Sequence, residues 1–283
     1  MKIIEKLKRN TRPAFAFEII PSVSGSSLRD ILETVEHLMP FDPQWINVPS
    51  HAQNAFEVCG AIYAHFRVPT VAHVLCRGYT TEQTEEALEE LSAMGVENLL
   101  LLRGEIPEFE KARVSGTKSY ADTVALVKEV CYSPFNFCVG VAGYPEKHIE
   151  STDLVSDVEY LKKKVDAGAH YVLTQMFFDN QLFYDFVERC RAAGIQVPII
   201  PGLRILTSLK HLSSIPERFH VTLPPQLVEE VLADPERAEE TGMRWAEAQG
   251  RDLIQNGHQT LHFFVMHNVQ HVKQVVESLM RAD

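Results

Sequence analysis

Residues 154–201, LVSDVEYLKKKVDAGAHYVLTQMFFDNQLFYDFVERCRAAGIQVPIIP, contain the repeating pattern from which the fold is predicted. An amphipathic segment with apolar residues at helical spacing ends at Gly168, and the strand candidate Tyr171–Gln175, which begins with an apolar run, follows it. A second amphipathic segment ends at Gly194, and the run Val197–Pro201 begins soon after it. Continuous apolar runs are typical of strands buried on both faces, and helices that alternate with such strands predict parallel pairing.

The same alternation extends over most of the chain, which has 283 residues, 45% of them hydrophobic. In one amphipathic segment Thr81 is the expected N-cap and Gly95 the expected stop. Eight strand–helix units in a chain of this length predict a single α/β domain over residues 1–283, a closed (β/α)₈ TIM barrel rather than an open doubly wound sheet. The eight expected strands are Phe15–Ile20, Trp45–Val48, Thr70–Leu75, Asn98–Leu102, Phe137–Gly143, Tyr171–Gln175, Val197–Pro201 and Thr260–Phe264.

Two stretches depart from this alternation. Ile106–Thr117 is a charged segment after the fourth strand and is expected to form a loop. Val221–Gly257 has helical periodicity on both sides of Pro235, and proline disfavours a continuous helix. We therefore expect two or more helices before the eighth strand.

Composition limits the class of function. The formal net charge is −11, and the densest basic run is only Lys162–Lys164, so a nucleic-acid partner is not expected. No stretch approaches the roughly 20 apolar residues of a membrane span, and the N-terminus lacks the apolar core of a signal peptide. An odd number of cysteines without a CxxC motif argues against a disulfide framework and fits a reducing, cytoplasmic location. The five are Cys59, Cys76, Cys131, Cys138 and Cys190.

Polar residues fall at the C-terminal ends of the expected strands, where barrel enzymes carry their chemistry. Glu18 lies among apolar residues on the first strand, and a carboxylate is costly to bury there unless it is paired or functional. Burial would raise its pKa, as a general acid near neutral pH requires. The residues alone leave open whether Glu18 is a general acid or a structural carboxylate paired with an arginine. His73 on the third strand is likewise open between a core histidine and a site residue.

The fourth and sixth strands also end in polar groups. Arg103 suits either a barrel salt bridge or a ligand contact, and Gly104 lets a ligand approach the backbone closely. Gln175 is followed by Met176 and two phenylalanines, a combination that suits a planar ring. The alternative is a core aromatic cluster in which Gln175 bonds to the backbone.

Metal and nucleotide motifs are weak or missing. Zinc is an alternative at His51, His73 and Cys76, which come from adjacent strand ends, but no two of them have the spacing of a zinc motif. We therefore expect no metal. The chain has no GxGxxG leading into a helix and no P-loop, so a nicotinamide would be held without a Rossmann domain.

Six motifs between Phe15 and Phe264 resemble, in order, those of methylenetetrahydrofolate reductases. Any one of them is weak, whereas six in sequence, each at an expected strand end or in the helix that follows, are specific. They are FEIIP at 17–21, LRGE at 102–105, GYPEKH at 143–148, KKKVDAGA at 162–169, TQMFFD at 174–179 and IIPG at 199–202.

The resemblance implies a (β/α)₈ barrel that holds FAD. NADH or NADPH would reduce the flavin, and methylenetetrahydrofolate would then enter the same face and be reduced to methyltetrahydrofolate. By resemblance Glu18 is the general acid that helps to open the five-membered ring of the folate, and Glu105 is a second catalytic carboxylate near the flavin. The lysines suit the pyrophosphate, whose charge needs neutralisation. The implied FAD-binding residues are His73, Arg103, Gly104, Tyr120, Ala121, Tyr144, His148, Asp157, Lys163 and Lys164.

The implied substrate contacts are Gln175, His211 and Asn268. Several positions depart from the family pattern. Glu105 stands where the family has aspartate, and Pro49 stands where a threonine is expected. His211 and Asn268 replace a glutamine that contacts folate and an arginine that meets the folate tail.

The flavin positions are therefore better kept than the folate positions. Two alternatives stay open: a barrel that has diverged to another pterin or takes electrons from a partner subunit, and a non-catalytic flavin- or folate-binding subunit. The residues do not choose between NADH and NADPH, nor between a monomer and a homo-oligomer.

Overall fold

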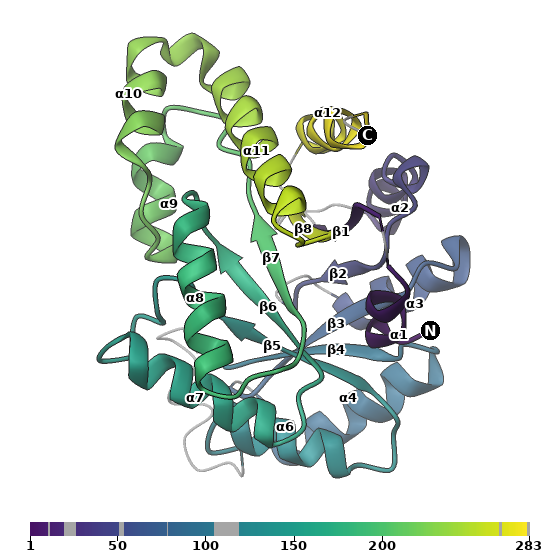
Figure 1. Cartoon of the computed structure of the whole chain (residues 1–283). Helices are drawn as coiled ribbons and strands as arrows, with labels where there is room; N and C mark the ends of the chain where they lie inside the picture. The colour runs from purple at the N-terminus through teal and green to yellow at the C-terminus, as the bar shows by residue number, and fades with distance from the viewer. Residues whose placement is uncertain are drawn as a thin grey trace.

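The computed structural model describes residues 1–10, 12–19, 27–50, 54–77, 79–104, 119–265 and 268–281. Eight parallel strands form a closed barrel in chain order, with helices around its outside (Figure 1). The predicted (β/α)₈ barrel is confirmed. The strands are β1 (Ala14–Ile19), β2 (Ile46–Val48), β3 (Thr70–Leu75), β4 (Asn98–Leu102), β5 (Cys138–Gly143), β6 (Tyr171–Met176), β7 (Ile199–Leu203) and β8 (Thr260–Val265).

Between β7 and β8 the chain forms three α-helices, of which the second lies farthest from the barrel, at the upper left of Figure 1, and the third leads back to β8. The two or more helices predicted there are confirmed, and a short 3₁₀ helix at Pro235 separates the last two. The helices are α1 (Ile3–Arg9), α2 (Leu28–Glu36), η1 (Met39–Phe41), α3 (Ala55–Phe66), α4 (Thr81–Ala93), α6 (Thr123–Tyr132), α7 (Leu154–Asp166), α8 (Asn180–Ala192), α9 (His211–Phe219), α10 (Pro225–Ala233), η3 (Pro235–Arg237), α11 (Ala238–Gln255) and α12 (Val269–Met280).

Some predicted boundaries differ from the structure. The N-cap of α4 is Thr80, so the prediction of Thr81 is wrong by one residue. The Thr80 hydroxyl accepts a hydrogen bond from the backbone N–H of Gln83, and the Gln83 side chain accepts one from the backbone N–H of Thr80. This reciprocal capping box favours Thr80 over its neighbour. The charged segment Ile106–Thr117 lies outside the described residues.

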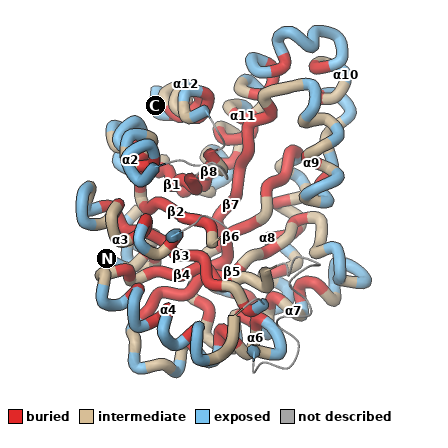
Figure 2. The backbone as a smooth tube through the Cα atoms, turned by 180° about the vertical axis from the view of Figure 1, so that it is seen from behind, coloured by how far each residue is buried: buried red, intermediate tan, exposed pale blue. Residues whose placement is uncertain are grey.

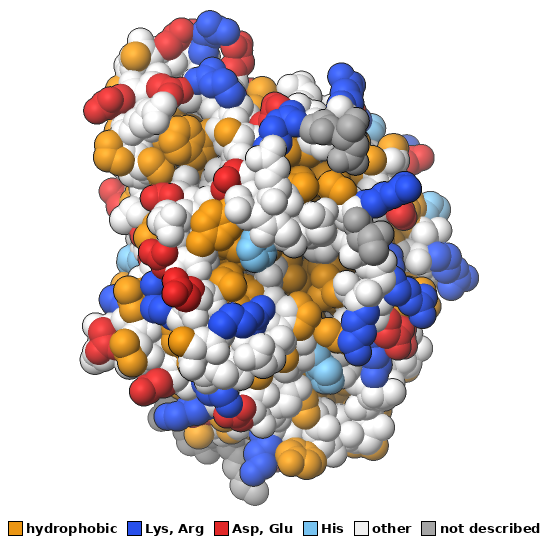
Figure 3. All heavy atoms as spheres, viewed as in Figure 1, with side chains coloured by type: hydrophobic (Ala, Val, Ile, Leu, Met, Phe, Trp, Pro, Cys, Tyr) orange, Lys and Arg blue, Asp and Glu red, His pale blue; other side chains and the backbone are white. Residues whose placement is uncertain are grey.

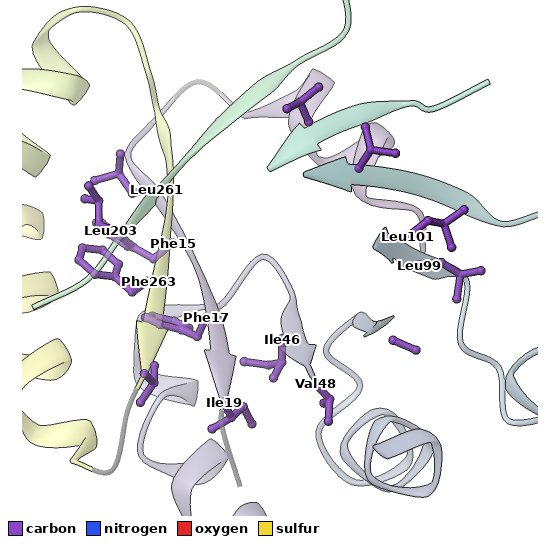
Figure 4. Packing of buried hydrophobic residues seen from close by; sticks show 14 of the residues in the cluster. Phe15, Phe17, Ile19, Ile46, Val48, Leu99, Leu101, Leu203, Leu261 and Phe263 are labelled. Carbon is purple, nitrogen blue, oxygen red and sulfur yellow. The ribbon is translucent and has the colours of Figure 1, made fainter. Parts of the chain in front are cut away.

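Strand side chains alternate between a face toward the helices and a face toward the barrel interior. Phe15, Phe17 and Ile19 of β1 belong to the core that packs under the helices, and Figure 4 shows Phe15 and Phe17 beside Phe263 of β8. Figure 2 shows that burial is concentrated along the strands, whereas the outer sides of the helices are exposed. The residues between these positions are therefore the ones that face the barrel interior.

Apolar side chains fill the part of the interior at the N-terminal ends of the strands, which we call the lower barrel; the part at the C-terminal ends is the upper barrel. Trp45, Leu100 and Tyr171 belong to one buried cluster there. Gly140 makes room for the tyrosine, because a Cβ at this position would lie 2.2 Å from Tyr171 Cζ. Among the described residues the packing at this end leaves the opposite end, at the C-termini of the strands, for a ligand.

Helix α1 closes the lower end of the barrel. Ile3 has no exposed surface and belongs to the interior cluster, and Ile4 and Leu7 pack against it. The backbone N–H of Ile3 donates a hydrogen bond of 2.8 Å to the Asn98 side chain at the start of β4. This helix therefore acts as an apolar plug that keeps water out of the core.

Truncating the plug should destabilise the fold. We expect Ile3→Ala to lower the free energy of unfolding by about 2–5 kcal/mol, because it removes buried methyl groups and leaves a cavity. Leu232→Ala is the matched control, since Leu232 is 58% exposed, and should change stability by less than about 0.5 kcal/mol. Chemical denaturation measures both, and equal effects would show that α1 does not seal the barrel.

Candidate active site

A buried carboxylate lies between two histidines in the upper part of the barrel interior. Glu18 Oε2 is 3.5 Å from Nε2 of His73 on β3 and 3.8 Å from Nε2 of His262 on β8. The three residues are only 8%, 5% and 0% exposed. The His73 ring also forms a 3.1 Å hydrogen bond with the side chain of Asn47 on β2. We call these four residues the Glu18 cluster.

Strand register brings the Glu18 cluster together. Glu18 is paired in register with Asn47 of β2 and with Phe264 of β8. His262 lies two residues before Phe264 and faces the same way, because side chains on a strand alternate with a period of two. The sequence identified Glu18 and His73 but missed Asn47 and His262. The period-two alternation across Thr260–Phe264 was the signal that could have found His262.

His262 is the least satisfied member of the Glu18 cluster. Both of its ring nitrogens are buried without a hydrogen-bond partner. Leaving a buried polar group unpaired typically costs about 1–3 kcal/mol. A proton on Nε2 would face the Glu18 carboxylate, so a small movement of either side chain would let the ring stabilise negative charge there.

A pocket of about 450 Å³ lies beside the ends of β4 and β5, between α6 and α7. We call it the β4–β5 pocket. Its volume falls in the usual range for small-molecule sites. Six of the residues that the resemblance assigns to the flavin line it: Arg103, Ala121, Tyr144, His148, Asp157 and Lys164.

Lys164 is a buried cation in the wall of the β4–β5 pocket. It is 6% exposed, and its Nζ donates a 2.7 Å hydrogen bond to the carbonyl of Ala142 at the end of β5. Burial lowers the pKa of Lys164 to about 8, with Asp157 acting in the opposite direction. Lys163, in contrast, is exposed on α7 and does not line the pocket. Only one of the two lysines is therefore in a position to meet a ligand in this pocket.

Asp157 organises the chain segment after β5. Its Oδ1 accepts hydrogen bonds from the backbone N–H of His148 at 3.0 Å and from the Ser151 hydroxyl at 2.7 Å. The His148 ring packs edge-on against Tyr144, with ring centroids 4.9 Å apart. Burial, and then the charge of Arg103, lowers the pKa of His148, so this ring is biased toward its neutral form.

Three other expected flavin positions lie around the Glu18 cluster or near the ends of β3 and β4. His73 belongs to the Glu18 cluster. Gly104 has φ +76°, and a Cβ there would lie 3.1 Å from Leu75 Cβ, so glycine suits this close turn. The carbonyl of Tyr120 accepts a contact of 3.7 Å from the Cys76 thiol. Glu105, the expected second carboxylate, lies outside the described residues.

A second pocket of about 420 Å³ lies beyond the ends of β7 and β8. We call it the β7–β8 pocket. His211 and Asn268, the two expected folate contacts that depart from the family pattern, both line it. Burial, and then the charge of Arg204, lowers the pKa of His211, and its Nδ1 accepts a 3.1 Å hydrogen bond from the Thr207 N–H.

Gln175 lies between the two pockets. It lines a narrow hollow together with Tyr144, which also lines the β4–β5 pocket, and Phe219, which also lines the β7–β8 pocket. Its Oε1 accepts a 2.9 Å hydrogen bond from the Met176 N–H. Pro49 is buried directly after β2.

The surface adds little to these sites. In the part of the chain that the structure describes, no three His, Cys, Asp or Glu side chains are grouped closely enough to hold a metal, and His51 lies outside that part. No helix among the described residues has the length and apolar character to cross a membrane.

Acidic and basic side chains are interspersed on the face shown in Figure 3, and the five cysteines are free thiols.

The fold and the site place the chain among (β/α)₈-barrel proteins with a buried carboxylate at the C-terminal ends of the strands. The sequence pattern of one such group, the methylenetetrahydrofolate reductase family, matches residues 3–280, and the chain belongs to this family.

The chain is 29% identical over 288 residues to methylenetetrahydrofolate reductase (NADH) 1 of Arabidopsis thaliana, covering 94% of this chain and 48% of that protein. It is 26% identical over 264 residues to 5,10-methylenetetrahydrofolate reductase of Escherichia coli, covering 90% and 86%. The chain thus spans about half the length of the plant and fungal relatives that it matches, and most of the bacterial one.

Solved structures support the fold. A protein from Clostridium thermocellum that binds two copies of 5-methyl-5,6,7,8-tetrahydrofolic acid superposes with a TM-score of 0.63 at 14% identity, covering 97% of this chain and 96% of the other. An aldo/keto reductase from Klebsiella pneumoniae in complex with NADP and acetate gives a TM-score of 0.56 at 16% identity, covering 95% and 86%. At these identities the likeness concerns the barrel alone.

Burying Lys164 should cost stability in the absence of a ligand. A pKa of about 8 in place of the usual 10.5 means that, as the pH rises, Lys164 loses its proton at a lower pH in the folded chain than in the unfolded chain. Below about pH 8 the buried charge lowers the free energy of unfolding by its full amount. This destabilisation becomes smaller as the pH rises from 8 toward 10.5. We expect Lys164→Met to raise the free energy of unfolding by about 1–3 kcal/mol near neutral pH, after loss of the Ala142 hydrogen bond.

Chemical denaturation of the ligand-free protein across this pH range measures the effect. The gain in the free energy of unfolding that Lys164→Met gives should become smaller above about pH 8. Lys163→Met, at the exposed neighbouring position, should stay within about 0.5 kcal/mol of the parent at every pH. A Lys164→Met variant less stable than the parent at neutral pH would show that the buried charge of Lys164 does not destabilise the ligand-free fold.

Proposed function

We propose that the chain is an FAD-dependent methylenetetrahydrofolate reductase, which takes electrons from NADH or NADPH and forms methyltetrahydrofolate. The observation that carries the proposal is the Glu18 cluster, a carboxylate buried between two imidazoles near the C-terminal ends of the strands. Reduction of the methylene bridge requires a proton donor that is shielded from water, and Glu18 meets that requirement. Membership of the family supports the same reading.

The residues of the β4–β5 pocket fit FAD. Lys164 and Arg103 supply positive charge for a pyrophosphate, and Tyr144 and Tyr160 supply aromatic surface. The burial of Lys164 supports an anionic ligand, because an anion offsets the cost of desolvating the ammonium group. When bound, FAD supplies the hydride that reduces the substrate.

The chain's own residues hold and move the proton. Glu18 donates a proton to a ring nitrogen of the folate and so opens the five-membered ring. His73 and His262 stabilise the carboxylate that remains, and Asn47 fixes the orientation of the His73 ring. Gln175, between the two pockets, positions the ring system that is bound there.

The nicotinamide and the folate use the same open end of the barrel in turn. Matching relatives are named for NADH in Arabidopsis thaliana and for NADPH in Caenorhabditis elegans, so the proposal covers both donors. Alternating use of one face suits a site whose lower interior is filled by apolar side chains.

Glu18→Gln separates the proton donor from the rest of the site. The amide keeps the shape of the carboxyl group but cannot donate the proton, so reoxidation of reduced flavin by methylenetetrahydrofolate should slow by about 10²–10⁴-fold. Reduction of the flavin by NADH or NADPH needs no proton from Glu18 and should change little. Anaerobic stopped-flow absorbance measures the two half-reactions separately.

The matched control is Glu188→Gln on the exposed surface of α8, which should leave both half-reactions unchanged. Equal loss in both half-reactions for Glu18→Gln would make Glu18 structural. A parent protein whose reduced flavin is not reoxidised by methylenetetrahydrofolate would favour a barrel diverged to another pterin.

Cofactor retention tests the β4–β5 pocket independently of turnover. A charge-assisted hydrogen bond to phosphate is worth about 1.5–3 kcal/mol, so Lys164→Met should weaken FAD binding about 10–100-fold. Lys163→Met should bind FAD like the parent, because Lys163 does not line the pocket. Titration of FAD into the flavin-free protein gives both dissociation constants, and equal values for the two variants would place the pyrophosphate elsewhere.

A further inference from the structure

Arg204 directly follows β7 and lies in the wall of the β7–β8 pocket. It is 6% exposed, and its Nε and Nη1 are buried without a hydrogen-bond partner. Its guanidinium carbon lies 5.0 Å from the centroid of the Phe219 ring. Burial, and then the charge of Arg218, lowers the pKa of Arg204 to about 10. The guanidinium is therefore held in the wall by packing, with donors that the described residues leave unused.

A buried, unpaired cation is costly, and the usual solution is an acceptor within the protein. None of the described residues that line the β7–β8 pocket is acidic, and Lys210 and Arg218 add two further positive charges. Glu239, which is close to the lining residue His271, is already paired with that histidine. The pocket therefore has an excess of positive charge that an anionic ligand would neutralise.

The β7–β8 pocket is connected to the Glu18 cluster through β8. Phe264 lines the pocket, is the register partner of Glu18 and lies with its ring 5.2 Å from that of His262. A ligand whose reacting ring lies at Glu18 thus has its other end directed past Phe264 toward Arg204. Folates have this form, with a pteridine at one end and glutamate carboxylates at the other.

We propose that Arg204 binds the terminal carboxylates of the folate in the β7–β8 pocket. The inference rests on the proposed function and adds a specificity-determining residue to it. Asn268, on the other wall of the pocket, caps α12 by accepting a hydrogen bond from the Gln270 N–H and has no charge to offer. The planar guanidinium of Arg204 presents parallel N–H groups that match a carboxylate, which the ammonium of Lys210 does not.

The experiment compares two ligands that differ only at the tail. The FAD-loaded protein is titrated with tetrahydrofolate and with tetrahydropteroate, which lacks the glutamate, and binding is followed calorimetrically under anaerobic conditions. We expect the parent to bind tetrahydrofolate about 10–100-fold more tightly than tetrahydropteroate. Arg204→Leu should lose that preference, and Arg204→Lys should keep only part of it. Arg237→Leu, which removes an exposed arginine that does not line the β7–β8 pocket, should keep the full preference.

The melting temperature of the ligand-free protein supplies a readout that a structural role would not give. Because Arg204→Leu removes a buried charge without a partner, it should melt no lower than the parent. An arginine that only held the fold together would lower the melting temperature when replaced and leave the preference for tetrahydrofolate intact. That combination would overturn the inference.

Two further outcomes are decisive. If Arg204→Leu instead slows flavin reduction by NADH or NADPH, the guanidinium binds a phosphate of the nicotinamide, and the assignment to the folate tail is wrong. If the parent binds neither pteridine, the proposed function itself fails. Equal binding of tetrahydrofolate by the parent and by Arg204→Leu would overturn the inference and leave the proposed function in place.

Discussion

The pairing of β1 with β8 is the interaction on which the site depends. All six residues of β1, Ala14–Ile19, are in register with the six residues of β8, Thr260–Val265, so the first and last strands close the barrel along their whole length. The closure brings Glu18 beside His262 and opposite Phe264. In an open sheet these two strands would be edges, and the carboxylate would face water instead of two imidazoles. Closure thus creates both the desolvated environment of Glu18 and its link to the β7–β8 pocket.

The buried polar groups of the upper barrel lower the stability of the fold, and the apolar packing of the lower barrel offsets this loss. Lys164, Arg204 and His262 are each buried with incomplete hydrogen bonding or with a lowered pKa, and each lowers the stability of the ligand-free chain. Below them Trp45, Tyr171 and the α1 plug form a continuous core. A chain can keep unsatisfied charges at a ligand site only when packing elsewhere exceeds their cost. The two ends of the barrel therefore have opposite roles, since the lower end stabilises the fold and the upper end is prepared for ligands.

The sequence predicted the barrel well because most of its strands are largely apolar runs, as burial on both faces requires. It predicted less of the site. Adjacent positions on a helix point about 100° apart, so three consecutive lysines did not reveal that Lys164 is buried and Lys163 is exposed. His262 was missed because it sits inside an apolar run, where it resembles a core residue. The sequence pattern did not place Arg204 directly at the end of a strand, because β7 ends two residues later than its apolar pattern indicates.

The two pockets lie on either side of the Glu18 cluster, and each has a buried cation of its own. Lys164 lies in the β4–β5 pocket and Arg204 in the β7–β8 pocket, with Gln175 in the hollow between them. Two anionic ligands can therefore be held by their charged ends on opposite sides while their neutral rings meet above Glu18. Such an arrangement lets charge fix the positions of both ligands without placing a cation next to the proton donor. A cation in direct contact with Glu18 would stabilise its ionised form and remove the proton that the proposed reaction uses.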